Sequence, residues 1–551
     1  MRIFKRNITL HSPSNTAGAG KGLRRGAMLL AATAALAGFS ACSDWDDHYD
    51  NTGVEGSSTT LWEQITARPE LSDFAEVLTS TKVFRQHKKT SVSYADLLNG
   101  GQSLTLFAPL NGTFNKDSLI ALTETAQGDS AVEVFFVKNH LAGTLRSAAD
   151  TTNNFRLLNG KHCFIQRDNA AGVPLEDSNV RSKNGIMHVL KTQMPYTFTI
   201  YESLTMLPEF EEAGTAIKKY NEDYFDADAS VSSGLVDGIP VYVDSVIYER
   251  NKLLEAIGAF KSEDSTFYVA VPTNAGWQAA WDKAASYFKY SSALEKCDSL
   301  QHYWTSRALY DDAVFSKTIQ ASMNDSVITY RYDASYPEYH VYYRPFDSDG
   351  LFGRANGMRK CSNGFLYYYD EWPFTPTQTY FRKIEQEAEY TWNIMKYDKC
   401  THNVRALNAD SISKGAYLDI VATSGTANWS VTYKLSNTLS GSYDFCAVVL
   451  PKTVEGPNGN MRPCKFKATI NYIDEDGTPQ TYNCGGKTFT TDPARVDTVM
   501  LAEDFKLPAC NYDQNNEKVS VTITCSITNK ESARYNREMY LDCIFLRPKD
   551  K

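Results

Sequence analysis

The sequence predicts an α+β chain in which two mixed helix-and-strand units are followed by an all-β sandwich. Two observations lead to this prediction. Segments between residues 65 and 190 recur in the same order between residues 204 and 369. From about residue 390, short alternating apolar runs replace the helical patterns. Residues before position 59 lie outside this fold, because they read as an export signal and a linker.

The first 41 residues have the composition of a secretory signal. They contain six basic residues and no acidic one, and the apolar run at 27–39 is too short to span a bilayer. Small residues then precede Cys42, as a cleavage site requires. This end resembles the lipobox of bacterial lipoproteins, which implies cleavage before Cys42 and acylation of Cys42, for example with palmitate. An ordinary signal peptide with an incidental cysteine is the alternative.

The residues after Cys42 resemble a sorting signal. Ser43–Asp47 resembles an acidic tag that sends lipoproteins to the outer face of the outer membrane in some Gram-negative groups. A solvated acidic tether is the alternative. We therefore expect a signal peptide at 1–41, a lipidated flexible tether at 42–58, and a location on the outer membrane facing the cell exterior. Gly, Ser, Thr and Asn in the tether favour flexibility.

Charge and missing motifs exclude several functions. Loss of the six basic signal residues changes the net charge from −9 to −15, which argues against nucleic acid and anionic lipid surfaces as partners. No later stretch is apolar enough to cross a membrane, so the acyl chains are the expected membrane contact. We find no nucleophile elbow, zincin, P-loop or Rossmann motif. The sequence thus predicts no catalytic, cofactor-binding or metal-binding residues.

Three matched segments define the repeat. Residues 65–78 match 204–217, residues 104–114 match 267–277, and residues 183–190 match 362–369. The offset grows from 139 to 163 to 179, so the second copy carries insertions of about 24 and about 16 residues. We therefore assign one unit to 59–196 and a second, divergent unit to 197–375.

Local patterns within the first copy predict its elements. Thr60 and Glu63 form a capping-box pattern, and an amphipathic helix is expected to start after Pro69. The apolar run at 104–108 predicts a buried strand ended by a proline turn, with Phe107 and Phe114 in the core.

These segments resemble the fasciclin domain. The T-x-F-A-P-x-N-x-x-F pattern is found at 105–114, the N-G-x-x-H-V pattern at 184–189, and a polar-His pair at Asn139–Leu141. The second copy departs from the pattern at Ala270 and Tyr367. The resemblance implies two β-sandwich wedges wrapped by small helices, with a history in adhesion and extracellular carbohydrate contexts. It also implies that His188 is a packed or hydrogen-bonded core residue.

The last third reads as an antiparallel sandwich at 389–551, joined by a linker at 376–388. Strands are expected at 417–421, 430–435, 444–450, 466–472, 519–524 and 540–546, because apolar and polar residues alternate there. The final run resembles the last strand of a galactose-binding-like jelly roll.

Cysteines in this region are predicted to be free, buried thiols. Asp476–Gly477 is a hairpin turn signal, which would place Cys464 opposite residue 489. Cys484 would then lie roughly 17 Å away along the strand, too far for a disulfide.

Tyrosines crowd residues 330–343, and further aromatic residues follow at 367–374. Exposed aromatic rings suit sugar or protein ligands, whereas strand packing is the alternative explanation. We expect a non-catalytic adhesion or binding module for an extracellular glycan or protein, with the sandwich and the Tyr-rich segment as contact surfaces. The alternatives are an accessory capture subunit beside an outer-membrane glycan transporter, and a glycan hydrolase with two carboxylates about 5–10 Å apart in one cleft.

Overall fold

The computed structural model describes residues 58–85, 88–236, 239–317, 325–407, 409, 411–456, 460–514 and 518–550. The predicted signal, Cys42 and nearly all of the tether lie outside these residues. The chain divides into two compact units, and the boundary falls between Tyr196 and Thr197. Among the described residues, no helix combines the length and hydropathy needed to cross a membrane.

The first unit mixes short helices with a curved sheet. Its helices are α2 (Leu61–Thr66), α3 (Ser72–Ser80), α4 (Tyr94–Asn99), α5 (Lys116–Leu122) and α6 (Ala126–Val132). Its strands are β1 (Lys82–Arg85), β2 (Lys88–Ser93), β3 (Leu104–Pro109), β4 (Leu141–Ala142), β5 (Asn153–Arg156), β6 (His162–Ile165), β7 (Asn169–Ala170), β8 (Val173–Ser182) and β9 (Gly185–Leu190). The main sheet has the order β4-β3-β9-β8-β7-β6-β5, and β1 and β2 form a separate hairpin.

Several local predictions for this unit are confirmed. Thr60 and Glu63 form the capping box of α2, and α3 buries its apolar face after a 3-10 turn at Pro69–Leu71. Phe107 is fully buried in β3. Phe114 is only half-buried, because it follows the proline turn and contacts the core from its edge.

The second unit begins with the same kind of fold. Its helices are α7 (Ile200–Met206), α8 (Glu211–Lys218), α9 (Lys252–Ile257), α10 (Asn274–Tyr287) and α11 (Cys297–Ala308). Its strands up to residue 369 are β10 (Asn221–Val236), β11 (Ile239–Asn251), β12 (Phe267–Pro272), β13 (Val314–Lys317), β14 (Ser326–Thr329), β15 (Val341–Tyr343), β16 (Gly357–Cys361) and β17 (Gly364–Tyr369). The sheet order is β15-β14-β13-β12-β17-β16.

The predicted internal repeat is confirmed by matching polar contacts. β3 pairs in parallel with β9, and β12 pairs in parallel with β17, each with its first residue opposite a glycine. Asn184 accepts from the Leu61 backbone N–H and donates to the Leu98 carbonyl in the last turn of α4 and to the Gly100 carbonyl just after it. Asn363 makes the same three bonds, with Ile200 N–H and two carbonyls after α9. The Asn-Gly pairs therefore tie helices to the central strands in both copies.

The glycine of each Asn-Gly pair is required by close backbone approach. A Cβ at Gly364, where φ is +142°, would lie 1.9 Å from the Phe267 carbonyl oxygen. A Cβ at Gly185 would lie 2.1 Å from the Leu104 carbonyl oxygen.

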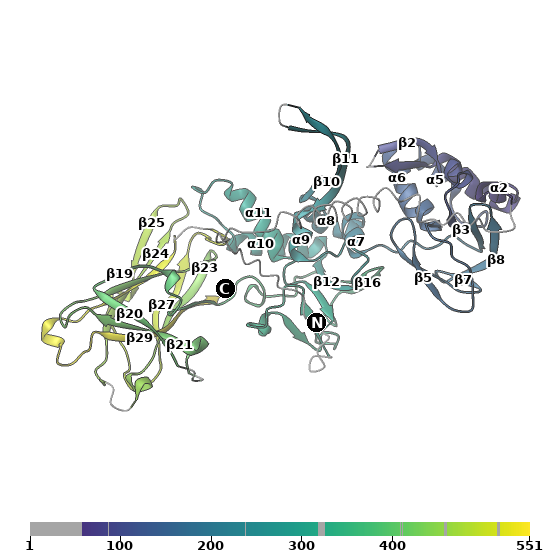
Figure 1. Cartoon of the computed structure of the whole chain (residues 1–551). Coiled ribbons are helices and arrows are strands. Elements are labelled where there is room, and N and C mark those ends of the chain that lie inside the picture. Colours follow the sequence, from purple (N-terminus) through teal and green to yellow (C-terminus); the bar gives the residue numbers. More distant parts are fainter. Residues whose placement is uncertain are drawn as a thin grey trace, which may run out of the picture. The chain divides into compact units, whose positions relative to one another are not determined.

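The insertion before the second proline strand lies in the β10–β11 hairpin. Residues 221–251 form this two-stranded ribbon, where the first copy has the short β1–β2 hairpin at 82–93. Figure 1 shows the ribbon extending well beyond α8 and α9.

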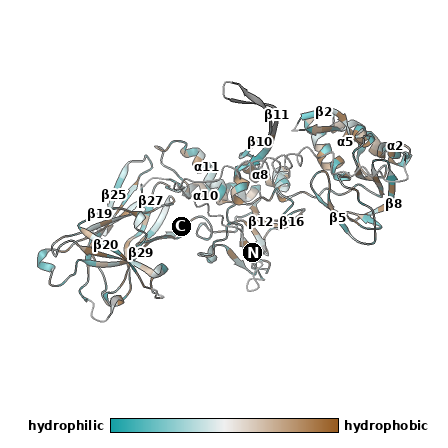
Figure 2. Ribbon diagram, in the orientation of Figure 1, coloured by the Kyte–Doolittle hydropathy of each residue, from teal (hydrophilic) through white to brown (hydrophobic). Residues whose placement is uncertain are grey.

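The C-terminal third forms two packed antiparallel sheets. Its strands are β18 (Ile384–Glu387), β19 (Ile394–Asp398), β20 (Cys400–Ala406), β21 (Ala416–Ala422), β22 (Ser430–Lys434), β23 (Gly441–Val449), β24 (Lys465–Ile473), β25 (Pro479–Asn483), β26 (Phe489–Thr490), β27 (Asp497–Leu507), β28 (Ser520–Cys525) and β29 (Glu538–Lys549). One sheet has the order β20-β21-β29-β23-β27 with β18 also on β29, and the other has β19-β22-β28-β24-β25 with β26 on β24. The six predicted strands are all present, and Figure 2 colours them by hydropathy.

Two details of this region differ from the sequence predictions. The predicted linker at 376–388 contains β18, which pairs with β29 and therefore belongs to the sandwich. The hairpin turn begins at Asp474, whose carboxylate accepts from the Asp476 and Thr478 backbone N–H groups. Ile473 consequently pairs with Pro479, so the register between β24 and β25 is one residue from the prediction.

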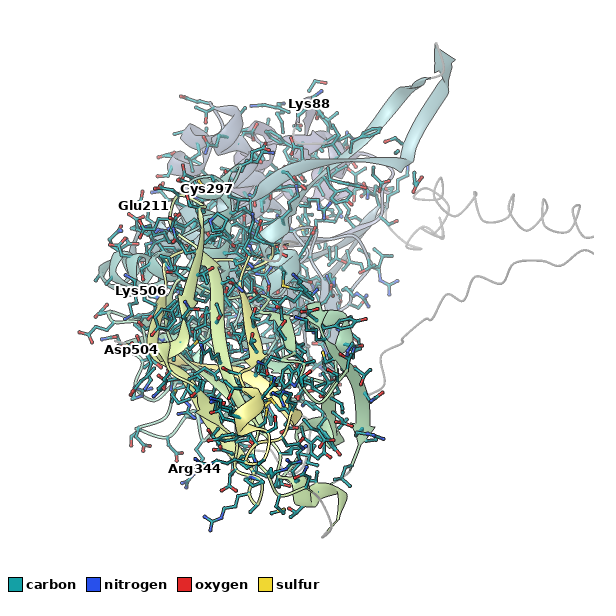
Figure 3. All side chains as sticks on the ribbon, turned by 90° about the vertical axis from the view of Figure 1, so that its left-hand side faces the viewer. Lys88, Glu211, Cys297, Arg344, Asp504 and Lys506 are labelled. Carbon is teal, nitrogen blue, oxygen red and sulfur yellow. The ribbon has the colours of Figure 1, made fainter. Side chains whose placement is uncertain are left out.

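The ten described cysteines are free thiols, and nine of them are buried. Cys297, labelled in Figure 3, is the half-buried one.

Candidate functional site

A cavity of the second unit has a volume of about 540 Å³ and lies between the repeat fold and the sandwich. Its walls come from the end of α11, the segment at 331–340, the segment at 379–386 and the sandwich loops near 436–443 and 512. This size is in the range of small-molecule sites. We call it the central cavity.

Aromatic rings line much of the central cavity. Trp304 and Tyr512 meet edge to face, with 4.6 Å between ring centroids. Tyr336 is 39% exposed and lies beside Tyr339, and Tyr380 adds a further ring. Rings of this kind offer flat apolar surfaces together with hydroxyl groups that can donate or accept.

Two adjacent buried carboxylates carry the charge of the cavity wall. Asp311 accepts a hydrogen bond of 2.6 Å from Arg307 and is also paired with Arg331. Asp312 pairs with Arg382 at 2.7 Å. Both aspartates are 7% exposed, so each needs its arginine to offset the cost of burial.

Burial shifts the protonation of this network. Desolvation raises the pKa of Asp312 to about 6, with Arg382 opposing that shift. Desolvation lowers the pKa of His340 to about 4, so its ring is neutral at pH 7. His340 Nδ1 lies 2.8 Å from the Thr329 hydroxyl oxygen and Nε2 lies 3.4 Å from an Arg382 nitrogen.

Two donors on the cavity wall lack a protein acceptor among the described residues. They are the Trp304 indole Nε1 and the Arg382 Nε. Buried donors are normally hydrogen-bonded, so each of these two groups is suited to an ordered water molecule.

The Tyr-rich segment divides between the cavity and the fold. Tyr336 and Tyr339 line the central cavity, whereas Tyr342 packs against Phe315 inside the sheet core. Tyr343 is 64% exposed and is not part of the cavity wall. Strand packing thus holds for Tyr342, and ligand binding by the other tyrosines stays a prediction.

His188 is a core histidine, as expected. It is fully buried, its Nε2 bonds to the Arg146 carbonyl oxygen at 2.8 Å, and its ring stacks on Phe107. In the second copy Ala270 and Tyr367 occupy the same paired positions, and the Tyr367 ring stacks on Phe352.

Sequence reasoning missed the charged half of the cavity. Arg307 and Asp311 stand four residues apart at the end of a helix, which is a signal of a paired contact. No sequence pattern connects Arg307 and Asp311 with Arg382 or Tyr512, because these residues come together only in the folded chain.

Comparisons with known proteins give no family. No family model and no curated protein matches the chain. Among solved structures, an exo-β-1,3-galactanase of Phanerochaete chrysosporium matches at 11% identity and a TM-score of 0.18, over 30% of this chain and 29% of that one. The chain thus spans under a third of that galactanase.

Two carbohydrate-binding modules of Clostridium thermocellum also match in part. The family 22 module of xylanase 10B has 12% identity and a TM-score of 0.20, over 30% of this chain and 91% of the module. The family 11 module has 12% identity and a TM-score of 0.18, over 30% of this chain and 96% of the module. Part of the chain is therefore similar to such modules, but TM-scores this low carry no argument about function.

Proposed function

We propose that this protein is a lipid-anchored, non-catalytic binder of an extracellular glycan, and that the glycan occupies the central cavity. The observation that carries the proposal is the pairing of aromatic rings with fixed, charged hydrogen-bonding groups in one cavity of suitable size. Tyr336 and Tyr339 offer ring surfaces, and the partly exposed guanidinium groups of Arg331 and Arg382 offer N–H donors in the wall.

A sugar fits this chemistry better than a flat apolar ligand does. Its C–H faces pack on aromatic rings, and its hydroxyl oxygens accept from arginine N–H groups. The buried Asp311 and Asp312 are held in place by arginines, so little ordering is needed when a ligand binds.

The test is binding to a glycan array followed by calorimetry with the best ligand. We expect micromolar or weaker affinity for the wild type. Tyr336→Ala and Tyr339→Ala should each weaken binding at least fivefold. Tyr343→Ala is the matched control, because it removes an exposed ring of the same segment outside the cavity. Equal binding by all three variants would contradict the proposed site.

Glycan hydrolysis is the second candidate, and Asp312 is the observation that favours it. A buried carboxyl with a pKa of about 6 inside a cavity is suited to general-acid chemistry. The arginines argue against it, because Arg307 and Arg331 bind both oxygens of Asp311 and Arg382 binds one oxygen of Asp312. Sugar release by the wild type that is lost in Asp312→Asn would establish a hydrolase.

Acylation of Cys42 and sorting to the cell surface are part of the proposal. Cys42→Ala should release the protein from membranes or leave it unprocessed, and mass spectrometry of Cys42 in the wild type should show acyl chains. An unmodified Cys42 in a membrane-bound protein would contradict the anchor.

The proposed surface-sorting signal at 43–47 is tested separately. Replacing Asp44, Asp46 and Asp47 by Ala should leave acylation intact but protect the protein from protease added to whole cells.

The accessory role in glycan uptake is tested by crosslinking on whole cells. A crosslink to an outer-membrane transporter would support it, whereas crosslinks to surface glycan alone would favour adhesion.

A further inference from the structure

Two strands of the sandwich bring two carboxylates and a thiol together beside the central cavity. β18 pairs with β29 so that Glu387 lies opposite Cys543 and Glu385 lies opposite Phe545. Directly opposed residues of an antiparallel pair project from the same face. Ligand atoms of Glu385, Glu387 and Cys543 accordingly all lie within 4.8 Å of one another.

This group is buried and short of positive charge. Glu387 is 4% exposed, and Glu389 and Asp542 are buried beside it. Lys383 pairs with Glu385, and the Lys414 charge acts on Glu387 from farther away. Four carboxylates thus share two lysines, which is costly in a buried site.

One carboxylate oxygen in the group receives no hydrogen bond from a donor in the part of the chain that the structure describes, and the Glu385 and Glu387 carboxyl groups lie close enough to interact with each other. Glu387 Oε1 accepts from the Ser413 hydroxyl at 2.7 Å, but Glu387 Oε2 is buried without a hydrogen bond. The same hydroxyl lies 3.2 Å from Glu385 Oε1, so Ser413 holds the two carboxylates in one arrangement. Two carboxyl groups held close together by one hydroxyl, with a buried oxygen that receives no donor, are the arrangement expected of metal ligands with their supporting hydrogen bond.

We propose that Glu385, Glu387 and Cys543 form a binding site for a divalent cation of the zinc class. Thiolate and carboxylate ligands together suit Zn²⁺, whereas Ca²⁺ takes oxygen ligands and would not use Cys543. Zinc–ligand bonds of about 2.0–2.3 Å place tetrahedral ligand atoms about 3–4 Å apart, so the three atoms need to close in by about 1 Å. Binding displaces the thiol proton to solvent.

The cavity supplies the route for the cation. Glu385 is half-buried and lines the central cavity, so an ion can reach the site from there. Three protein ligands leave a fourth position for water or for a ligand atom. The bound ion would also fasten the short edge strand β18 to β29 and neutralise part of the buried negative charge.

The experiment uses the full purified chain after treatment with a chelator. We expect one Zn²⁺ per chain in a chelator-competition titration, and a near-ultraviolet thiolate-to-metal absorption band with Co²⁺. Glu387→Gln should weaken Zn²⁺ binding at least tenfold. Cys543→Ser should do the same and abolish the cobalt band. Cys446→Ser is the matched control, because Cys446 is buried in the same side-chain cluster but outside the ligand group.

Three results would overturn the site. They are the absence of stoichiometric Zn²⁺ binding by the wild type, Zn²⁺ binding unchanged in Glu387→Gln, and a Ca²⁺-specific site insensitive to Cys543→Ser. Circular dichroism monitors the fold of each variant, and Glu387→Gln, which keeps the side-chain shape, decides the question where Cys543→Ser does not fold.

Discussion

At the scale of residues, the first unit depends on a buried histidine, His140, that is uncharged at neutral pH. His140 is fully buried, its Nδ1–H donates to the Phe136 carbonyl oxygen at 2.8 Å, and its Nε2 accepts from the Met194 backbone N–H at 2.9 Å. Desolvation of the buried ring lowers the pKa of His140 to about 4. In addition, a proton added to Nε2 would point at the Met194 N–H.

This histidine predicts a pH dependence of stability. The unfolded state takes up a proton near pH 6.5, whereas the folded state does so only near pH 4. Stability contributed by neutral His140 is thus present above pH 6.5 and is lost as pH falls toward 4, by about 3 kcal/mol in full. Hydrogen exchange of β3 and β9 between pH 7 and pH 4 measures it. His140→Asn, which cannot titrate, should show a smaller decline, and an equal decline would contradict this role.

The core position of Phe107 gives a second prediction at this scale. Its ring stacks on both Phe155 and His188, and the side chain is fully buried. Phe107→Ala should cost about 3–5 kcal/mol of the stability of the first unit. Denaturant unfolding followed by hydrogen exchange in β3 checks this value. Phe164→Ala is the control, because the Phe164 side chain in β6 is 36% exposed and its loss should change stability little.

At the scale of elements, turn and capping signals predicted the repeat well because they act locally. Asn-Gly pairs, proline-ended strands and capping boxes each require specific residues at fixed spacing, and both copies keep them. The strands that were not predicted from the sequence have patterns other than a regular alternation of apolar and polar residues. β18 reads Ile-Glu-Gln-Glu and buries its polar residues, and β27 contains acidic residues beside irregular pairing with β23.

Asn184 tests the importance of the contacts between helices and strands. Its side chain bonds to Leu61 N–H, the Leu98 carbonyl and the Gly100 carbonyl, and it is 3% exposed. Asn184→Ala leaves these buried groups unpaired, so the first unit should lose about 2–5 kcal/mol. Thermal unfolding with probes in α2 and β9 measures the loss. Asn154→Ala, at an exposed strand position, should leave the transition unchanged.

At the scale of the whole molecule, the cavity could not be foreseen because its walls meet only through tertiary packing. The sequence predicted the Tyr-rich segment and the sandwich as separate contact surfaces, and the cavity is lined by both. The two surfaces meet because the repeat fold and the sandwich share one continuous apolar core. Phe381 lies between Tyr287 of the repeat fold and Tyr443 of the sandwich, with ring centroids 4.4 and 4.9 Å apart.

This shared core predicts which parts fold alone. The first unit has its own apolar clusters, so a fragment of residues 58–196 should unfold cooperatively. A fragment of residues 197–375 should not, because it loses Phe381 and the backbone bonds that join residues 287 and 289 to residues 440 and 510. Near-ultraviolet circular dichroism and limited proteolysis distinguish the two outcomes. A protease-resistant, cooperatively melting 197–375 fragment would show instead that the repeat fold is complete without the sandwich, and that the cavity lies between two independent domains.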